Sequence, residues 1–199
     1  MSEIAIFGAT FDPPTSAHLE IIKYLSEYYD EVIVIPTTVR YYKENKHMFS
    51  FNERLNMIKN KVGDIKNIYF YDIERTADEN WRFYDSLMRT KELYTADANF
   101  TVAMGADSYL NFKTWSEWET ILKEAKLLVF KRPGYDISNV NIPAKIVEMD
   151  NPASSSALRK KISEYMSDDD FDTWIDDLSF NKVYDDNYTE EEAIAMGKW

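Results

Sequence analysis

Short hydrophobic runs alternate with amphipathic segments along most of the chain, which indicates strands alternating with helices. Residues 3–7 form the first apolar run, and a helix is predicted from about Ser16, with apolar side chains three or four positions apart. The next run, over residues 32–35, is continuously apolar and stops at Pro36, as expected of a strand covered on both faces of a parallel sheet. These three segments predict a βαβ unit with a right-handed crossover.

The same alternation continues toward the C-terminus. We expect further helices at residues 51–61, 83–93, 115–124 and 155–165, and further strands at residues 67–73, 100–104, 127–130 and 145–149. Repetition of this kind favours an α/β fold, a doubly wound, Rossmann-like parallel sheet in a single domain with a small helical C-terminal part. Ligands of such sheets lie at the carboxyl ends of the strands, near the point where the strand order reverses.

The last part of the chain differs in composition from the rest. Residues 167–177 are strongly acidic, and the final residues are polar. We expect the domain to cover residues 1–184 and a polar C-terminal tail to cover residues 185–199, with both segments solvated.

Charge and composition exclude several classes of function. The chain has 199 residues, a net charge of −12 and no cysteine, which excludes disulfides and thiolate catalysis. A nucleic-acid partner would require a basic surface. No apolar run approaches the length of a membrane span, and the N-terminus lacks the features of a signal peptide. We therefore expect a cytoplasmic protein that binds neither nucleic acid nor a membrane; its oligomeric state stays open, a homo-oligomer included.

The segment after the first predicted strand carries the first candidate chemistry. It reads GATFDPPTSAH, from Gly8 to His18. Gly8 and Ala9 leave room for a ligand beside the backbone, and Thr15 or Ser16 can cap the helix that follows. His18 would then lie in the first helical turn, where free N–H groups and the helix dipole favour a phosphate. Taken alone, the segment is more typical of an ordinary turn with a capping threonine and a surface histidine.

A second segment of similar character begins the predicted helix at residues 155–165. It reads SSSALRKK, from Ser154 to Lys161. Ser155 and Ser156 can cap the helix and face phosphate oxygens, and Arg159 offers a planar guanidinium one turn later. Basic residues in a first turn oppose the helix dipole, and an anionic ligand would remove that conflict.

Together these two motifs resemble the nucleotidylyltransferase superfamily with its (H/T)xGH and ISSTxxR signatures. Here the signatures read TSAH, ending at His18, and ASSSALR, ending at Arg159. Thr15 stands where the commonest signature has its first His, as in some nicotinamide mononucleotide adenylyltransferases, and Ala17 stands in place of the Gly.

The middle of the chain resembles the nicotinate/nicotinamide mononucleotide adenylyltransferases within that superfamily. Residues 51–57 resemble their RlxM helix, and Gly105-Ala106-Asp107 followed by Trp115 resembles their GAD…W segment. Residues 131–135 read KRPGY and resemble a strand end of that family. The five segments keep the family's order from residue 4 to residue 184.

The resemblance implies an enzyme of NAD biosynthesis. It would transfer AMP from ATP to nicotinate or nicotinamide mononucleotide and release pyrophosphate, with Mg²⁺ on the triphosphate. The family's SYT-like segment, which receives the nicotinate carboxylate, is absent; residues 79–87 read ENWRFYDSL, and Arg82 could instead pair with a carboxylate. Two alternatives stay open: transfer to another phosphorylated acceptor such as phosphopantetheine, and a non-catalytic nucleotide-binding regulator.

The resemblance also implies roles for individual residues. His18 and Arg159 would contact the reacting phosphates, Thr15 would help to position them, and Asp107 would contact the adenosine ribose. The implied ATP-binding residues are Gly8, Ala9, Thr10, Phe11, His18, Asp107, Arg132, Ser155, Ser156 and Arg159. The implied mononucleotide-binding residues are Thr10, Phe11, Lys43, Lys46, Trp81 and Trp115.

Two further interpretations concern aromatic and basic side chains. Trp115 would stack on the pyridine ring while Trp118 packs in the core, and Trp81 would either pack or line the ring pocket. His47 is interpreted as a surface residue. The basic residues in or beside the motifs would form the local pocket that an acidic chain needs for nucleotides; they are Arg40, Lys43, Lys46, Lys131, Arg132 and Arg159.

Overall fold

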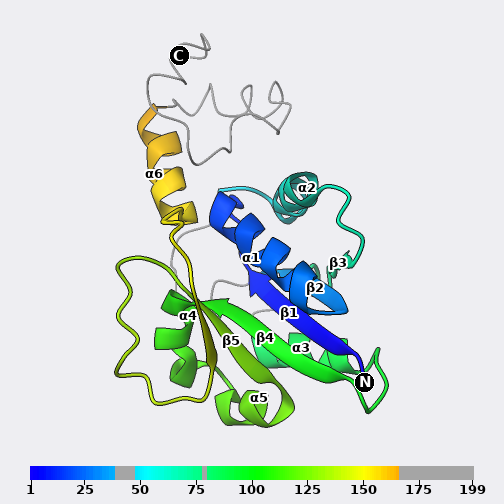
Figure 1. The fold of residues 1–199 in the computed structure, drawn as a ribbon. Helices are drawn as coiled ribbons and strands as arrows, with labels where there is room; N and C mark the ends of the chain where they lie inside the picture. The colour runs from blue at the N-terminus through cyan, green and yellow to red at the C-terminus, as the bar shows by residue number, and fades with distance from the viewer. Residues whose placement is uncertain (39–47, 78–79, 166–199) are drawn as a thin grey trace.

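The computed structural model describes residues 1–38, 48–77 and 80–165. A parallel sheet of six strands in the order β3-β2-β1-β4-β5-β6 forms its centre (Figure 1). The predicted doubly wound, Rossmann-like α/β fold is thereby confirmed. The strands are β1 (Glu3–Ala9), β2 (Glu31–Pro36), β3 (Ile68–Phe70), β4 (Asn99–Gly105), β5 (Lys126–Lys131) and β6 (Lys145–Glu148).

Helices cover both faces of this sheet because the central strands present apolar side chains on each side. In β1, Ala5 and Phe7 pack into one core cluster, whereas Ile4 and Ile6 pack into the other. The helical elements are α1 (Ser16–Tyr28), α2 (Phe51–Val62), α3 (Phe83–Lys91), α4 (Ala106–Leu110), the short 3₁₀ helix η1 (Phe112–Thr114), α5 (Trp118–Glu124) and α6 (Ser155–Tyr165).

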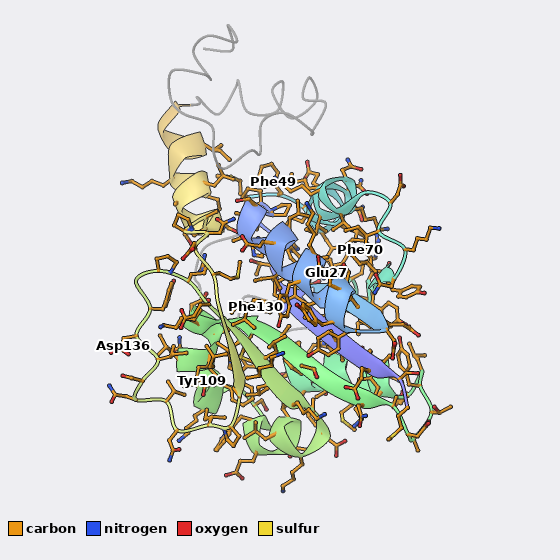
Figure 2. All side chains as sticks on the ribbon, viewed as in Figure 1. Glu27, Phe49, Phe70, Tyr109, Phe130 and Asp136 are labelled. Carbon is orange, nitrogen blue, oxygen red and sulfur yellow. The ribbon has the colours of Figure 1, made fainter. Side chains whose placement is uncertain are left out.

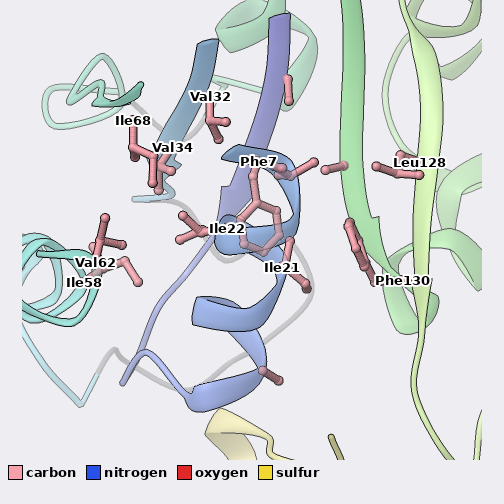
Figure 3. Packing of buried hydrophobic residues seen from close by; sticks show 14 of the residues in the cluster. Phe7, Ile21, Ile22, Val32, Val34, Ile58, Val62, Ile68, Leu128 and Phe130 are labelled. Atoms are coloured by element: carbon pink, nitrogen blue, oxygen red, sulfur yellow. The ribbon is translucent and has the colours of Figure 1, made fainter. Parts of the chain in front are cut away.

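The two core clusters divide the helices between the faces. Ile22 of α1 and Ile58 of α2 pack against the first face, together with Val34 of β2 (Figure 3). Leu87 of α3 and Ile121 of α5 pack against the second face. Burying each of these side chains stabilises the fold by about 1.5–3 kcal/mol, so the sheet depends on both layers.

The strand order reverses at β1, which pairs with β2 on one side and with β4 on the other. All pairings are parallel, so the carboxyl ends of the strands meet at one edge. Helix α1 follows β1 and α4 follows β4 at this edge. In Figure 1 the start of α6 lies beside the start of α1. The chain thus gathers three helix starts where the sequence predicts a ligand.

Several sequence-based boundaries are wrong, among them the end of the helix expected at residues 83–93, which ends at Lys91. The strand expected at residues 67–73 is only Ile68–Phe70, because a turn closed by the Arg75 N–H on the Asp72 carbonyl follows it. The helix expected from residue 115 begins at Trp118, because Glu117 adopts a left-handed conformation with φ of 57°. The first strand continues one residue beyond Gly8.

Several predictions concern segments outside the described ranges. The acidic residues 167–177, the tail at 185–199, and Arg40, Lys43, Lys46 and His47 all belong to this group. Within the described part, no helix is long and apolar enough to cross a membrane.

The central and edge strands should differ sharply in their tolerance of truncation. Ile33 of β2 is fully buried, whereas Ile146 of β6 is 39% exposed. We expect Ile33→Ala to lower the free energy of unfolding by about 2–5 kcal/mol, because it removes buried methyl groups and leaves a cavity. Ile146→Ala should cost less than about 1 kcal/mol. Urea denaturation of both variants checks this, and equal losses would contradict the assignment of β6 as an exposed edge.

Candidate active site

The loop between β1 and α1 is held by a buried arginine of α2. Arg54 is only 1% exposed, and its guanidinium donates hydrogen bonds to the carbonyl oxygens of Thr10, Thr37 and Phe49. These carbonyls follow β1, follow β2 and precede α2. One side chain therefore sets the relative position of three segments at the carboxyl edge of the sheet.

Asp12 connects the same loop to the start of α2. Its fully buried carboxylate accepts hydrogen bonds from the backbone N–H of Met48, at 3.1 Å, and of Phe49, at 2.9 Å. Phe49 lies close to the N-terminal end of α1 (Figure 2). The Arg159 guanidinium lies 3.9 Å from the same carboxylate. Charge and hydrogen bonds both stabilise the ionised form of this buried group.

His18 lies in the first turn of α1, and the helix cap determines which of its ring nitrogens carries the proton. The Thr15 N–H donates to His18 Nδ1 at 2.9 Å, and Thr15 is the residue that caps the helix. A backbone N–H can only donate, so Nδ1 carries the lone pair and Nε2 carries the proton. The ring packs against Phe11, with ring centroids 5.0 Å apart.

The His18 ring is neutral at physiological pH. Its burial, and then the positive charges of Arg132 and Lys61, lower its pKa to about 3. His18 can therefore offer an Nε2–H hydrogen bond at neutral pH, whereas the sequence left a positive charge on this ring as an alternative. A neutral donor still stabilises an oxyanion in a site with little water.

The second motif lies directly against the first. Ser155 Oγ donates to the Pro13 carbonyl at 2.8 Å, and the Arg159 guanidinium donates to the Asp12 carbonyl. Arg159 also reaches Ser156 Oγ at 3.1 Å. These contacts join residues 142 and 147 positions apart in the chain. The two motifs, which are far apart in the sequence, therefore lie in direct contact in the structure.

The cap of α6 differs from the expectation that Ser155 and Ser156 fill this role. Ser154 is the capping residue, because its Oγ accepts the Ala157 N–H at 3.1 Å. The Ser155 hydroxyl is engaged by the Pro13 carbonyl, and Ser156 by Arg159.

Arg132 and Asp107 form the side of the site next to β5. Arg132 donates to the Ala153 carbonyl at 2.6 Å, and its guanidinium lies 3.7 Å from the Asp107 carboxylate. Gly105 permits this arrangement, since a Cβ there would lie 2.6 Å from Asp107 Oδ1. A cavity of about 420 Å³ adjoins Arg132; it is lined by Lys131, Arg132, Pro133, Gly134, Tyr135, Asp136, Glu148, Met149 and Asp150.

Aromatic side chains form the other side of the site. The Trp115 ring is half-buried, and its centroid lies 5.2 Å from that of the Phe83 ring and 5.4 Å from that of the Phe112 ring. The Trp118 and Phe112 rings have centroids 6.4 Å apart, as the predicted packing role of Trp118 requires. The Phe83 ring also covers Gly8, because a Cβ at Gly8 would lie 2.8 Å from Phe83 Cε2. The room that the sequence predicts beside Gly8 is thus filled by this ring.

A buried carboxylate links the aromatic side to the end of β2. Trp81 donates to Ser86 Oγ at 2.9 Å, and Ser86 donates to Glu74 at 2.6 Å. Glu74 also accepts the Thr38 N–H at 3.0 Å. Burial raises the pKa of Glu74, while these hydrogen bonds and the nearby Arg54 charge act in the opposite direction. Glu74 thereby fixes Trp81 relative to the strand end.

The predicted site residues fall into three groups. His18, Thr15, Ser155, Ser156 and Arg159 are brought together around the Asp12–Pro13 segment, with Thr10 and Phe11 in the same loop. Arg132 and Asp107 lie on one side, and Trp81 and Trp115 belong to the aromatic and hydrogen-bonded contacts on the other. Lys43 and Lys46 lie outside the described residues.

Sequence reasoning missed Asp12, Arg54, Glu74 and Phe83 as site residues. Asp12 lies in the GATFDPPTSAH segment and Arg54 lies in the motif at residues 51–57, so their positions were a usable signal. Glu74 stands alone among polar residues and gives no such signal.

The depressed His18 pKa should appear in the pH dependence of stability. The folded protein then binds one proton fewer than the unfolded chain between pH 3 and the ordinary pKa of 6.5. As the pH is lowered from 6.5, we expect the free energy of unfolding to decrease. The decrease should exceed that of His18→Asn by up to about 1.4 kcal/mol per pH unit. Asparagine keeps an acceptor for the Thr15 N–H but does not titrate. Urea denaturation at pH 7 and pH 5 measures this, and parallel curves would show that the ring titrates normally.

Comparisons with known proteins identify the family of this chain. The cytidylyltransferase-like family model matches residues 6–161. A probable nicotinate-nucleotide adenylyltransferase from Fusobacterium nucleatum is 30% identical, covering 75% of this chain and 77% of its own length. The corresponding protein from Leptospira interrogans is 32% identical, covering 78% and 82%.

Solved structures show the same fold. A Plasmodium falciparum nicotinic acid mononucleotide adenylyltransferase complexed with NaAD superposes with a TM-score of 0.71 at 22% identity, over 99% of this chain and 97% of that one. The same enzyme complexed with APC gives a TM-score of 0.68 at 21% identity, over 99% and 96%. The motifs, their contacts and a family match over most of the chain agree, and the chain belongs to the cytidylyltransferase-like family.

Proposed function

We propose that this chain transfers the AMP part of ATP to nicotinate mononucleotide and releases pyrophosphate, as a nicotinate-nucleotide adenylyltransferase of NAD biosynthesis. The observation that carries this proposal is the contact between the two phosphate-type helix starts, through Ser155 on the Pro13 carbonyl and Arg159 on the Asp12 carbonyl. Relatives of this name cover most of the chain, at 30% and 32% identity. The chain is accordingly a nucleotidyltransferase.

The acceptor supplies its own nucleophile. A phosphate monoester is largely dianionic near pH 7, because its second pKa is about 6. One of its oxygens attacks the α-phosphorus of ATP in line, a new P–O bond forms, and the bond from the α-phosphorus to the bridging oxygen breaks. Pyrophosphate leaves with the electron pair of that bond. No proton has to be removed, so the protein needs position and charge rather than a general base.

His18 is suited to the α-phosphate. Its Nε2–H is a donor at neutral pH, since the Thr15 N–H occupies Nδ1. We assign it to a non-bridging oxygen of the α-phosphate, where negative charge is redistributed during the transfer. The dipole at the N-terminal end of α1 would add to the same effect.

Arg159 and Arg132 are suited to the leaving pyrophosphate and to the rest of ATP. Each guanidinium uses one nitrogen to hold a backbone carbonyl, of Asp12 or of Ala153. Both guanidinium groups are therefore fixed before a substrate arrives, so substrate binding loses little side-chain conformational entropy. Asp107, which is 55% exposed and 3.7 Å from Arg132, would accept a ribose hydroxyl.

Mg²⁺ would be carried by the triphosphate. In the described part of the chain, no three His, Asp or Glu side chains are grouped as metal ligands. Mg²⁺ commonly keeps several waters and binds substrate phosphates with few or no protein ligands. The ion would therefore enter the site together with ATP. When bound, the ion would neutralise part of the phosphate charge.

The acceptor's pyridine ring would lie on the aromatic side of the site. Trp115 is a half-buried aromatic ring that contacts Phe83, and the Phe83 ring in turn covers Gly8. Stacking on an indole ring suits a flat, electron-poor ring. Arg82, at the start of α3, is the basic residue that could meet a ring carboxylate, which favours nicotinate over nicotinamide.

The acceptor can be identified directly. We expect the purified protein with ATP and Mg²⁺ to convert nicotinate mononucleotide into the deamido dinucleotide, detected by its mass. Nicotinamide mononucleotide should react more slowly, and phosphopantetheine should give no product. A product with phosphopantetheine alone would overturn the proposed acceptor. No product with any acceptor, from protein with a cooperative unfolding transition, would favour a regulatory role.

Loss of the His18 donor should reduce turnover without unfolding the protein. We expect His18→Asn and His18→Ala both to lower kcat by about 10²-fold or more, because each removes the Nε2–H group. His18→Asn is the matched control for structure, since its amide oxygen can still accept the Thr15 N–H. A steady-state pyrophosphate-release assay measures the effect, and near-normal turnover in either folded variant would remove His18 from the mechanism.

A further inference from the structure

One aromatic side chain lies between the phosphate loop and Trp115. The Phe83 ring covers Gly8 so closely that a Cβ there would lie 2.8 Å from Phe83 Cε2 and 3.2 Å from Cδ2. On another side the same ring contacts Trp115, with centroids 5.2 Å apart and planes inclined by 59°. Phe83 therefore bridges the end of β1 and the tryptophan that is suited to stacking.

The helix that carries Phe83 is firmly held, and the ring at its first position is only partly buried. Phe83 is the first residue of α3, whose start is fixed by the Arg82 N–H on the Asp85 carboxylate at 2.7 Å. Leu87 anchors the helix in the core with no exposed surface. The Phe83 side chain is only partly buried, so it can turn about its own side-chain bonds while α3 stays in place.

The neighbouring aromatic residues have less freedom. Trp81 is fixed by its hydrogen bond to Ser86, which continues to the buried Glu74. Trp115 is packed against Phe112, a ring with no exposed surface, as well as against Phe83. Phe83 is held by apolar contacts alone, because a phenyl ring forms no conventional hydrogen bond. It is the member of this group that costs least to move.

We infer that Phe83 controls access to the acceptor's ring site: a pyridine ring that stacks on Trp115 beside the Gly8 loop displaces the Phe83 ring. The inference rests on the proposed function. An acceptor whose phosphate reacts near His18 must place its ring within one nucleoside of that loop. Phe83 fills the space between this loop and Trp115. Binding then exchanges the Phe83–Trp115 contact for a pyridine–Trp115 contact.

Removal of the ring should therefore improve acceptor binding. An aromatic pair contributes an amount that corresponds to about 2- to 10-fold in affinity. We expect Phe83→Ala to lower the KM for nicotinate mononucleotide by this factor and to leave the KM for ATP unchanged. Calorimetric titration of the mononucleotide without ATP should show the same gain in affinity, independently of turnover.

Three further variants accompany this measurement. Phe83→Leu keeps apolar volume against Gly8 but has no ring, so it should give part of the gain and guards against a folding defect. Trp118→Phe alters a tryptophan that contacts Phe112 but not Phe83, and should leave acceptor affinity unchanged. Gly8→Ala places a Cβ against the Phe83 ring, so its effect on acceptor affinity should be smaller in the Phe83→Ala background.

The outcomes separate this inference from the proposed function. If the unaltered protein forms no product with nicotinate mononucleotide, the proposed function fails. If it forms product and Phe83→Ala raises the acceptor KM, or leaves it unchanged, Phe83 is a fixed wall of the site and the inference is overturned. Additive effects of Gly8→Ala and Phe83→Ala would overturn it as well.

Discussion

A single buried cation determines how the carboxyl edge of the sheet is arranged. The Arg54 guanidinium is almost completely removed from water, and an unpaired charge there would cost several kcal/mol. The backbone carbonyls of Thr10, Thr37 and Phe49 and the nearby charge of Glu74 help to offset this cost. Because the three carbonyls belong to different segments, the phosphate loop, the end of β2 and the start of α2 cannot shift independently.

The site also explains how an acidic chain can receive anionic substrates. The net charge is −12, yet Arg132 and Arg159 converge where the two motifs meet. Both side chains are fixed by backbone carbonyls, so the local field is set by the fold and not by the overall charge. His18 adds a directed donor without adding charge, because its environment keeps the ring neutral. Preorganised donors of this kind are most effective where water is excluded.

The sequence was a good guide wherever a local pattern decides the structure. The apolar run at residues 32–35 predicted β2, since both of its faces are buried, and the helix at Ser155–Tyr165 was predicted at both ends. Choices made by distant contacts could not be read in this way. Three consecutive serines are equally able to cap α6, and the Pro13 carbonyl decides among them. Likewise, nothing near Glu74 in the sequence indicates that it will fix Trp81 through Ser86.

The contact between the two ends of the domain has a consequence for synthesis. Strands β1, β2, β3 and β4 can pair once residues 1–105 exist, whereas the Asp12 and Pro13 carbonyls are held by side chains of α6. A nascent chain on the ribosome can therefore build most of its sheet while the phosphate site is still open. The Asp12–Pro13 side of that site is completed only when residue 159 has emerged, so the site closes after most of the sheet has formed.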